Sequence, residues 1–471
     1  MISKNTSSYK IDELKILLVL GLATFIVPFM GSALNLALPE ISRTFSMSAV
    51  TLTWFNNIYI ISTAIFQMPA ARISDIFGRR KIFALGVVFL TVPTFLTGIA
   101  PNIEILFSLR FLAGLGSAMT NSTITAIITS IFQPPKRGKI IAIITAVVYA
   151  SLAIGPFFGG LLTHYLGWQS IFFSCSLIGV VILILIPFSL KEEWIEAKNT
   201  SFDIVGSVIY GVALFATIYG FTNLSNLSGI LWLASGIIAF VIFILYERKI
   251  ENPLIYLKLF VTNRVFAFSS LASLINYAAT FAIIFMLSLY LQYIRGLDPK
   301  TAGLMLIPQA VVQTIVSILV GQISEKKIHP SNIATFGMIV VVFGLFGLIF
   351  ISPDTSFYFI IFLFILLGIG FGCFSAPNTN VIMSSVDKKY YGFASGTAGT
   401  VRLVGQSLSM GIAGMVISFQ MGTNKLVPEY FPDFMYSMRI VFIIFLVLCI
   451  IGVFASNARN TKNETKKETS F

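Results

Sequence analysis

Residues 71–81 read ARISDIFGRRK and form a dense charged loop between two long apolar runs. Only 11% of the chain is charged, so this concentration of charge needs a reason. Gly78 permits a tight turn. Asp75 is an acid among bases, and it can hold Arg79, Arg80 or a helix N-terminus. The stretch therefore predicts a sharp charged turn between two helices; the alternative is an ordinary basic loop.

The rest of the chain is too apolar for a soluble globular protein. Of its 471 residues 56% are hydrophobic, and the mean hydropathy is +0.91. A membrane-spanning helix needs about 20 apolar residues. Short alternating strands, as in a lipid-facing barrel, are not the pattern here. We expect an all-α polytopic membrane protein whose fourteen approximate spans are 14–38, 50–70, 82–100, 105–132, 139–163, 168–190, 203–222, 229–246, 266–294, 301–323, 331–352, 356–384, 391–419 and 435–456.

The formal charge of +12 indicates orientation and needs no nucleic-acid partner. With the N-terminus in the cytoplasm, about 24 of the 31 Lys and Arg residues lie on the cytoplasmic side, as the positive-inside rule requires. Cytoplasmic pairs include Lys326-Lys327 and Lys388-Lys389. Both termini are then predicted to be cytoplasmic, and the polar tail to be disordered.

A second charged loop, residues 321–327 (GQISEKK), repeats the order of residues 71–81: a small residue, Ile, Ser and then an acid before bases. It follows the tenth span as residues 71–81 follow the second. This predicts two related six-helix halves with spans 7 and 8 inserted between them. The expected organisation is 1–190 for the N-terminal half, 191–250 for the linker and inserted helices, 251–456 for the C-terminal half and 457–471 for the tail.

Span 5 contains residues 151–160, SLAIGPFFGG. Pro156 removes a backbone donor and bends the helix. Gly155, Gly159 and Gly160 allow another helix to approach closely. A packing seam alone would explain the run.

These stretches together resemble the major facilitator superfamily, and the fourteen spans resemble its 14-helix drug:proton antiporter family. The Gly155-Pro156 run resembles the motif of its drug antiporters, and residues 71–81 resemble the loop taken to latch the cytoplasmic helix ends. The resemblance implies a multi-pass protein of the cytoplasmic membrane that exports small amphipathic molecules by alternating access, coupled to protons. Four positions depart from the family pattern. In the charged loop Ala71 replaces the leading Gly and Ile76 replaces the Arg that usually follows the acid. Met30 replaces an acid commonly found five residues before Asn35, and Ala113 replaces a Gln.

Polar residues inside the spans are candidates for the substrate and coupling cavity. Arg110 and Arg402 stand out, because a charge at the bilayer centre costs roughly 2.5–3.5 kcal/mol. Each belongs to a polar stripe on one helical face; interhelical hydrogen bonding without a substrate is the alternative. The candidates are Asn35, Asn57, Gln67, Arg110, Asn121, Asn276, Gln309, Gln313, Asn378, Arg402 and Gln406.

The deep parts of the predicted spans contain no acid. Two embedded arginines without visible acidic partners favour an anionic or neutral amphipathic substrate. Alternatives are uptake or export of an anionic metabolite, and a membrane sensor without transport. An enzyme is not expected, because nucleophile–base, metal-ligand and phosphate-loop patterns are missing from the sequence. We expect a monomer with a small-molecule substrate and protons as partners, in a lipid bilayer, without metal or cofactor.

Overall fold

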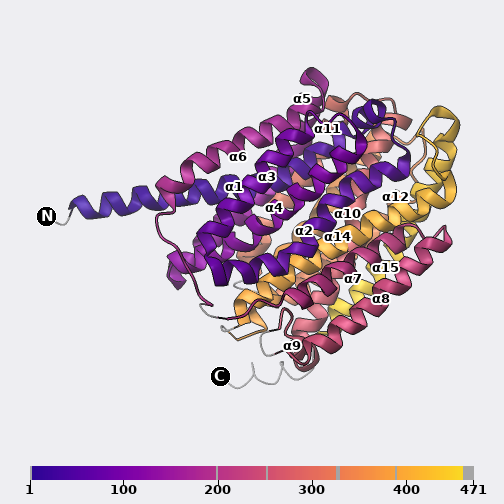
Figure 1. Ribbon diagram of the computed structural model, residues 1–471. Helices are drawn as coiled ribbons and strands as arrows, with labels where there is room; N and C mark the ends of the chain where they lie inside the picture. The colour runs from indigo at the N-terminus through magenta and orange to yellow at the C-terminus, as the bar shows by residue number, and fades with distance from the viewer. Residues whose placement is uncertain (1–2, 198–199, 251–252, 325–328, 388–389, 460–471) are drawn as a thin grey trace.

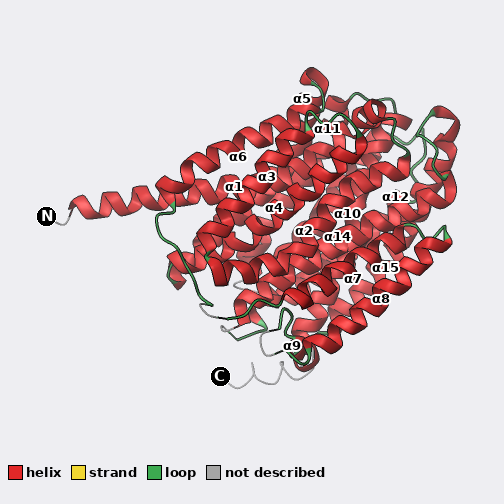
Figure 2. Ribbon diagram, viewed as in Figure 1, coloured by secondary structure: helices red, strands yellow, loops and turns green. Residues whose placement is uncertain are grey.

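A computed structural model describes residues 3–197, 200–250, 253–324, 329–387 and 390–459. The described residues form helices joined by loops and turns, and they contain no strand (Figure 2). Fourteen of its helices are long and apolar enough to cross a membrane. The helices are α1 (Ser3–Phe45), α2 (Ala49–Phe77), α3 (Arg79–Thr97), α4 (Ile103–Ile131), α5 (Pro134–Leu166), α6 (Gln169–Ser189), α7 (Ile204–Thr222), α8 (Leu227–Glu247), α9 (Leu257–Thr262), α10 (Arg264–Leu289), α11 (Pro299–Ser324), α12 (Pro330–Leu348), α13 (Phe357–Ser384), α14 (Tyr391–Met421) and α15 (Phe431–Ala458).

The helix ends follow local sequence signals. Ser48, Asn102 and Asn263 cap α2, α4 and α10 with side-chain oxygens that accept the backbone N–H three residues ahead. Such caps satisfy amides that the first helical turn leaves unpaired. The short helix α9 and a π-helical turn at Tyr290–Ile294 were not expected from the sequence.

The two six-helix halves repeat one packing pattern. In α1–α6, α3 packs on α4 and α6, α1 on α5 and α6, and α2 on α4. In α10–α15 the corresponding helices pack in the same way, with α12 on α13 and α15, α10 on α14 and α15, and α11 on α13. The halves meet where α2 packs on α14 and α5 on α11 (Figure 1).

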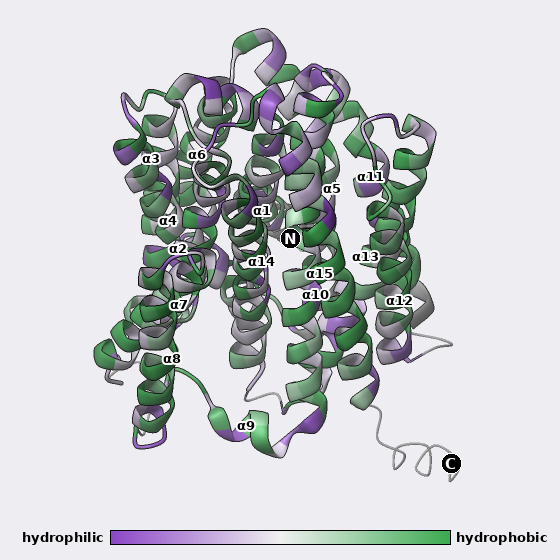
Figure 3. Ribbon diagram, turned by 90° about the vertical axis from the view of Figure 1, so that its right-hand side faces the viewer, coloured by the Kyte–Doolittle hydropathy of each residue, from purple (hydrophilic) through white to green (hydrophobic). Residues whose placement is uncertain are grey.

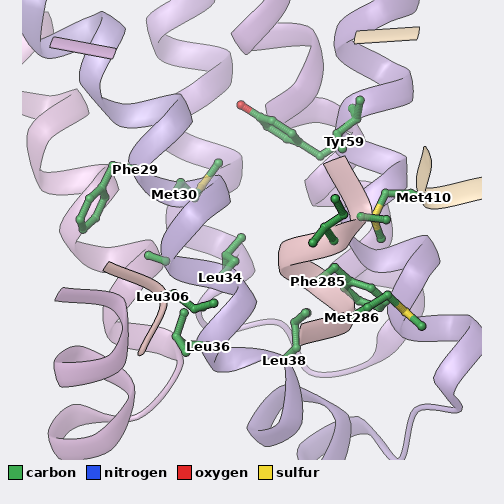
Figure 4. Packing of buried hydrophobic residues seen from close by; sticks show 14 of the residues in the cluster. Phe29, Met30, Leu34, Leu36, Leu38, Tyr59, Phe285, Met286, Leu306 and Met410 are labelled. Carbon is green, nitrogen blue, oxygen red and sulfur yellow. The ribbon is translucent and has the colours of Figure 1, made fainter. Parts of the chain in front are cut away.

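The inserted helices α7 and α8 form a hairpin on the outside of the bundle (Figure 3). α7 contacts α2 of one half and α14 of the other. α8 is the least buried of the spans and presents Leu231, Ile238 and Val241 outward. Apolar residues exposed along a helix of this length belong against lipid. The largest apolar core contains residues of both halves, including Met30 and Leu34 of α1 and Met286 of α10 (Figure 4).

The C-terminal boundary lies later than expected. α15 runs to Ala458, and Arg459 is only 1% exposed because its guanidinium donates to Asn378, Ser331 and Ser456. The predicted disordered tail therefore does not begin at residue 457. Residues 460–471, and the predicted loop residues 325–328 and 388–389, lie outside the described residues.

Candidate functional site

The loop that opened the sequence analysis connects α2 to α3 through a single residue. Gly78 lies at φ 111°, in the region that favours glycine, and its N–H donates to Ser74. Arg79 follows at once and is 5% exposed. Its guanidinium donates twice to Asp75, at 3.0 and 2.8 Å, and also to the carbonyl of Ala126 in α4 at 3.1 Å. Arg79, at the start of α3, is thus bonded to α2 through Asp75 and to α4 through Ala126. All three helices belong to the same half. We call residues 75–80 the gate loop.

The linker after α6 covers the gate loop, and its acids were missed by the sequence analysis. Glu196 pairs with Arg79, and Glu193 accepts the N–H of Arg80 at 2.8 Å. The carbonyl of Asp75 accepts N–H groups of residues 196 and 197 at 3.1 and 2.9 Å. A signal for them was present in the sequence. Glu193 and Glu196, like Asp75, are acids on the side predicted to be cytoplasmic, and such acids need basic partners.

The Gly-Pro run of α5 lies where α5 crosses α1 and α11. A methyl group on Gly155 would stand 2.6 Å from Ser32 of α1, and one on Gly160 would stand 2.5 Å from the carbonyl of Pro299 at the start of α11. Gly159 lies as closely against α1, and Pro156 contacts Gly303 of α11. The run is therefore a close helix seam, with α1 of the same half on one side and α11 of the other half on the other.

Several polar bonds between described residues join the halves at or toward the end opposite the gate loop, which we call the far end. At that end the N–H of Ala49 donates to Asn424 at 3.3 Å, and the amine of Lys300 donates to Tyr165 at 3.3 Å. Ser288 of α10 donates to the carbonyl of Asn35 in α1 at 2.5 Å. These contacts join the two halves on this side of the molecule.

One far-end contact brings a histidine of one half to an aspartate of the other. Nδ1 of His164, in α5, lies 3.6 Å from Oδ1 of Asp298, just before α11. The hydroxyl of Thr301 donates to Asp298 at 2.6 Å, and the N–H of Lys300 donates at 3.0 Å. The Thr301 hydroxyl, assisted by these amides and by His164, holds the pKa of Asp298 below its usual value. Asp298 therefore caps α11 and anchors it to the other half.

Polar side chains of both halves meet mid-span. Arg402 of α14 is exposed, and it lies close enough to Tyr149 of α5 to interact with it electrostatically. Tyr277 of α10 and Ser375 of α13 share a hydrogen bond of 3.0 Å beside them. Arg402 therefore lies near polar residues of both halves. Tyr149 was not among the predicted residues, since a lone Tyr in an apolar span has no distinguishing pattern.

Arg110 has a different environment and is 3% exposed. Its guanidinium carbon lies 4.6 Å from the ring centre of Tyr59 and 5.1 Å from that of Phe55. Its Nη1 lies 3.9 Å from the sulfur of Met30. Cation–π contacts stabilise a desolvated cation by up to about 2 kcal/mol. Met30, the residue at the expected acid position, is thus a direct neighbour of this arginine.

The remaining candidates divide between the interface and the interiors of the halves. At the interface, Asn57 accepts from Ser407 of α14 at 2.6 Å, and Gln67 faces Gly399 of α14. Within a half, Asn121 donates to Ser117, and Asn378 accepts from Arg459 at 2.6 Å. Asn276 and Gln309 are buried, and each has a side-chain polar atom without a hydrogen bond. Gln313 and Gln406 are half-buried.

Comparisons with known proteins agree with this arrangement. The model of the Major Facilitator Superfamily matches residues 20–410. Multidrug resistance protein Stp of Mycobacterium tuberculosis (strain CDC 1551 / Oshkosh) is 30% identical over 416 residues, which is 86% of this chain and 76% of Stp. Riboflavin transporter RibZ of Clostridioides difficile (strain 630) is 25% identical over 441 residues, 93% of this chain and 95% of RibZ.

The fold also matches a solved structure. A bacterial homologue of the human lysosomal transporter Spinster, in an inward-facing and unoccupied conformation, superposes with a TM-score of 0.68. The alignment covers 94% of this chain and 96% of the other, at 16% sequence identity. At this identity the likeness establishes the shared fold of the two halves.

Proposed function

Since the chain belongs to the major facilitator superfamily, we propose that it exports small amphipathic, drug-like compounds across the cytoplasmic membrane by alternating access between its two halves. The observation that carries this proposal is the polar cluster of Arg402, Tyr149, Tyr277 and Ser375, which draws on four helices from both halves. A site divided between two bodies changes its exposure when they rock against each other. The relative named a multidrug resistance protein supports export as the direction.

In this proposal the two halves separate and rejoin at the seam of α5 and at the far-end contacts. Glycines at residues 155, 159 and 160 let α5 lie directly against α1 and α11. Close backbone contact with few interlocking side chains allows one helix pair to part and rejoin. In our proposal the far end opens to release substrate, while the gate loop closes against the other half. The division at residues 190 and 250, and function as a monomer with both termini in the cytoplasm, belong to the same proposal.

The charge of the cluster bears on the substrate. Arg402 is an exposed cation between the halves, and Arg110 is a buried one within the first half. A carboxylate or a polarised carbonyl group would satisfy such donors, whereas a cationic drug would meet repulsion. We therefore propose neutral and anionic amphipathic compounds as substrates, exported in exchange for protons.

A dye-efflux measurement in proteoliposomes tests this function. The full-length protein is reconstituted with an anionic, a neutral or a cationic fluorescent dye, and a pH gradient is imposed with and without a protonophore. We expect gradient-dependent movement of the anionic and neutral dyes. Arg402→Ala should reduce anionic dye transport at least about tenfold, the equivalent of 1.4 kcal/mol of binding. Arg439→Gln, an exposed arginine at the far end, is the matched control.

Three results would each contradict a part of the proposal. Dye movement that is unchanged after the protonophore collapses the gradient would exclude proton coupling. Binding of dye without any movement would favour a sensor over a transporter. Preserved anion export by a folded Arg402→Ala protein would remove the assigned role of that arginine.

A second candidate is transport of an anionic or neutral heteroaromatic metabolite. The riboflavin transporter among the relatives aligns over nearly the whole of both chains and supports it. The same proteoliposomes distinguish the two, since a metabolite carrier would move riboflavin and leave synthetic dyes in place.

A further inference from the structure

Two carboxyl groups meet at the base of the inserted hairpin. Asp203 precedes α7, where its Oδ1 accepts the N–H of Gly206 at 2.9 Å and the hydroxyl of Tyr246 at 3.2 Å. Glu247 ends α8 and is 3% exposed. Oδ2 of Asp203 and Oε1 of Glu247 both lie under 3.0 Å from the point where Gly206 would carry a side chain. The two carboxyl groups are within hydrogen-bonding reach of each other.

These two oxygens are the unsatisfied ones. Oδ2 of Asp203 and Oε1 of Glu247 are buried, and neither has a hydrogen-bond partner in the described part of the chain. The ion pairs formed between described residues include neither acid. The basic residues that follow, Arg248 and Lys249, are exposed to solvent. Two charged carboxylates in a dry site repel each other, and a single proton between them removes the repulsion and satisfies both oxygens.

The acids belong to the two linkers that join the hairpin to the halves. Asp203 ends the linker from α6, whose Glu193 and Glu196 cover the gate loop. Glu247 accepts the N–H of Ile255 at 3.2 Å, in the linker that leads through α9 to α10. α7 itself contacts α2 and α14. A bond between the acids therefore joins the linker of one half to the linker of the other.

We propose that Asp203 and Glu247 form a proton-binding site in which one shared proton fastens the two linkers together. The site is separate from the mid-span cluster, and it goes beyond the proposed export because it holds for either direction of transport. It places a titratable group in the inserted hairpin of a chain that has Met30 at the expected acid position. When the proton leaves, the carboxylates repel and the linkers separate.

Infrared difference spectroscopy on the full-length protein in lipid nanodiscs tests the shared proton directly. Spectra are compared between about pH 5 and about pH 9, a range that covers buried carboxyls. We expect a protonated-carboxyl carbonyl band that disappears in Glu247→Gln and in Asp203→Asn. Asn caps a helix as well as Asp does, so the second variant keeps the α7 N-terminus intact. Glu192→Gln, an exposed acid of the first linker, should keep the band.

Thermal unfolding against pH gives a second readout. A proton held by the folded state and released on unfolding stabilises the fold at low pH, and that stability is lost as the pH rises through the site's titration. The unfolding midpoint of the native protein should fall over this range, and that of Glu247→Gln should change less. A band retained in both variants, or equal pH slopes in all proteins, overturns the proposal. So does a pH slope that sodium abolishes and choline does not, because the pair would then bind a metal cation. None of these readouts depends on transport.

Discussion

At the scale of single residues, Arg110 shows how a buried cation is accommodated without an acid. The rings of Tyr59 and Phe55 and the sulfur of Met30 surround its guanidinium. Ring faces and sulfur stabilise a cation weakly, and each such contact is worth about 0.5–2 kcal/mol. The desolvation cost of the cation is therefore offset only in part, which leaves Arg110 able to accept a stronger partner.

A double-mutant cycle measures how strongly Arg110 interacts with a carboxylate placed at residue 30. Met30→Glu places a carboxylate next to Nη1 of Arg110, so the two should couple by about 1–3 kcal/mol in stability. The cycle combines Met30→Glu with Arg110→Gln, and chemical unfolding in mild detergent supplies the free energies. Met30→Leu, of similar volume, should couple with Arg110→Gln by less than about 0.5 kcal/mol. Equal coupling for Glu and Leu would show that Met30 does not face the guanidinium.

At the scale of elements, the seam of α5 depends on the absence of side chains. Gly160 lies close against the start of α11, and Gly155 lies close against α1. α5 therefore contacts α1 of its own half and α11 of the other half. A larger side chain at residue 160 would push α5 and α11 apart and so weaken the contact between the halves.

Gly160→Ala tests this seam. Its new methyl group would lie 2.5 Å from the Pro299 carbonyl, and overpacking of this kind costs about 1–3 kcal/mol. We expect a lower unfolding midpoint and a population shifted toward an open far end. Gly21→Ala is the control, because its methyl group would meet nothing within 4 Å. Differential scanning fluorimetry measures the unfolding midpoints of both variants. An unchanged midpoint for Gly160→Ala would contradict the close approach.

At the scale of the whole molecule, the halves are joined mid-span and at the far end, and this distribution defines the conformation. The His164–Asp298 pair is the part of this closure that depends on pH, because His164 carries charge only when protonated. Asp298 keeps its charge into acid, since the hydroxyl of Thr301 above all lowers its pKa. The stability that its charge contributes is present above the usual aspartate range and is lost only as the pH falls through the lowered pKa.

Acid should therefore favour closure of the far end. Protonation of His164 places a cation 3.6 Å from Oδ1 of Asp298, and the pair then strengthens. Both side chains are partly exposed, so the effect should be small, within about 1 kcal/mol. Distances between spin labels in the α3–α4 and α12–α13 loops report the opening. His164→Gln should remove the pH dependence, and persistence of that dependence would assign it to another group.

Much of the fold could be predicted from the sequence. Spanning helices must satisfy every backbone group within one segment, so uncharged runs of sufficient length identify all fourteen of them. The chain order of residues 71–81 and the glycines at 155, 159 and 160 likewise predicted a charged turn and a close helix contact, because both follow from local chemistry. The resemblance to the family came from these local patterns, and the match of the family model over residues 20–410 confirms it.

Only the tertiary structure decided which residues meet. Helical spacing placed Arg110 and Arg402 on similar polar stripes, yet one is enclosed by aromatic rings and the other lies near polar residues of both halves. Asp203 and Glu247 are separated along the chain by the whole hairpin, and no spacing rule brings them together. The physical reason is that a helix fixes which face a residue occupies, whereas the partner of that face is chosen by packing between distant segments.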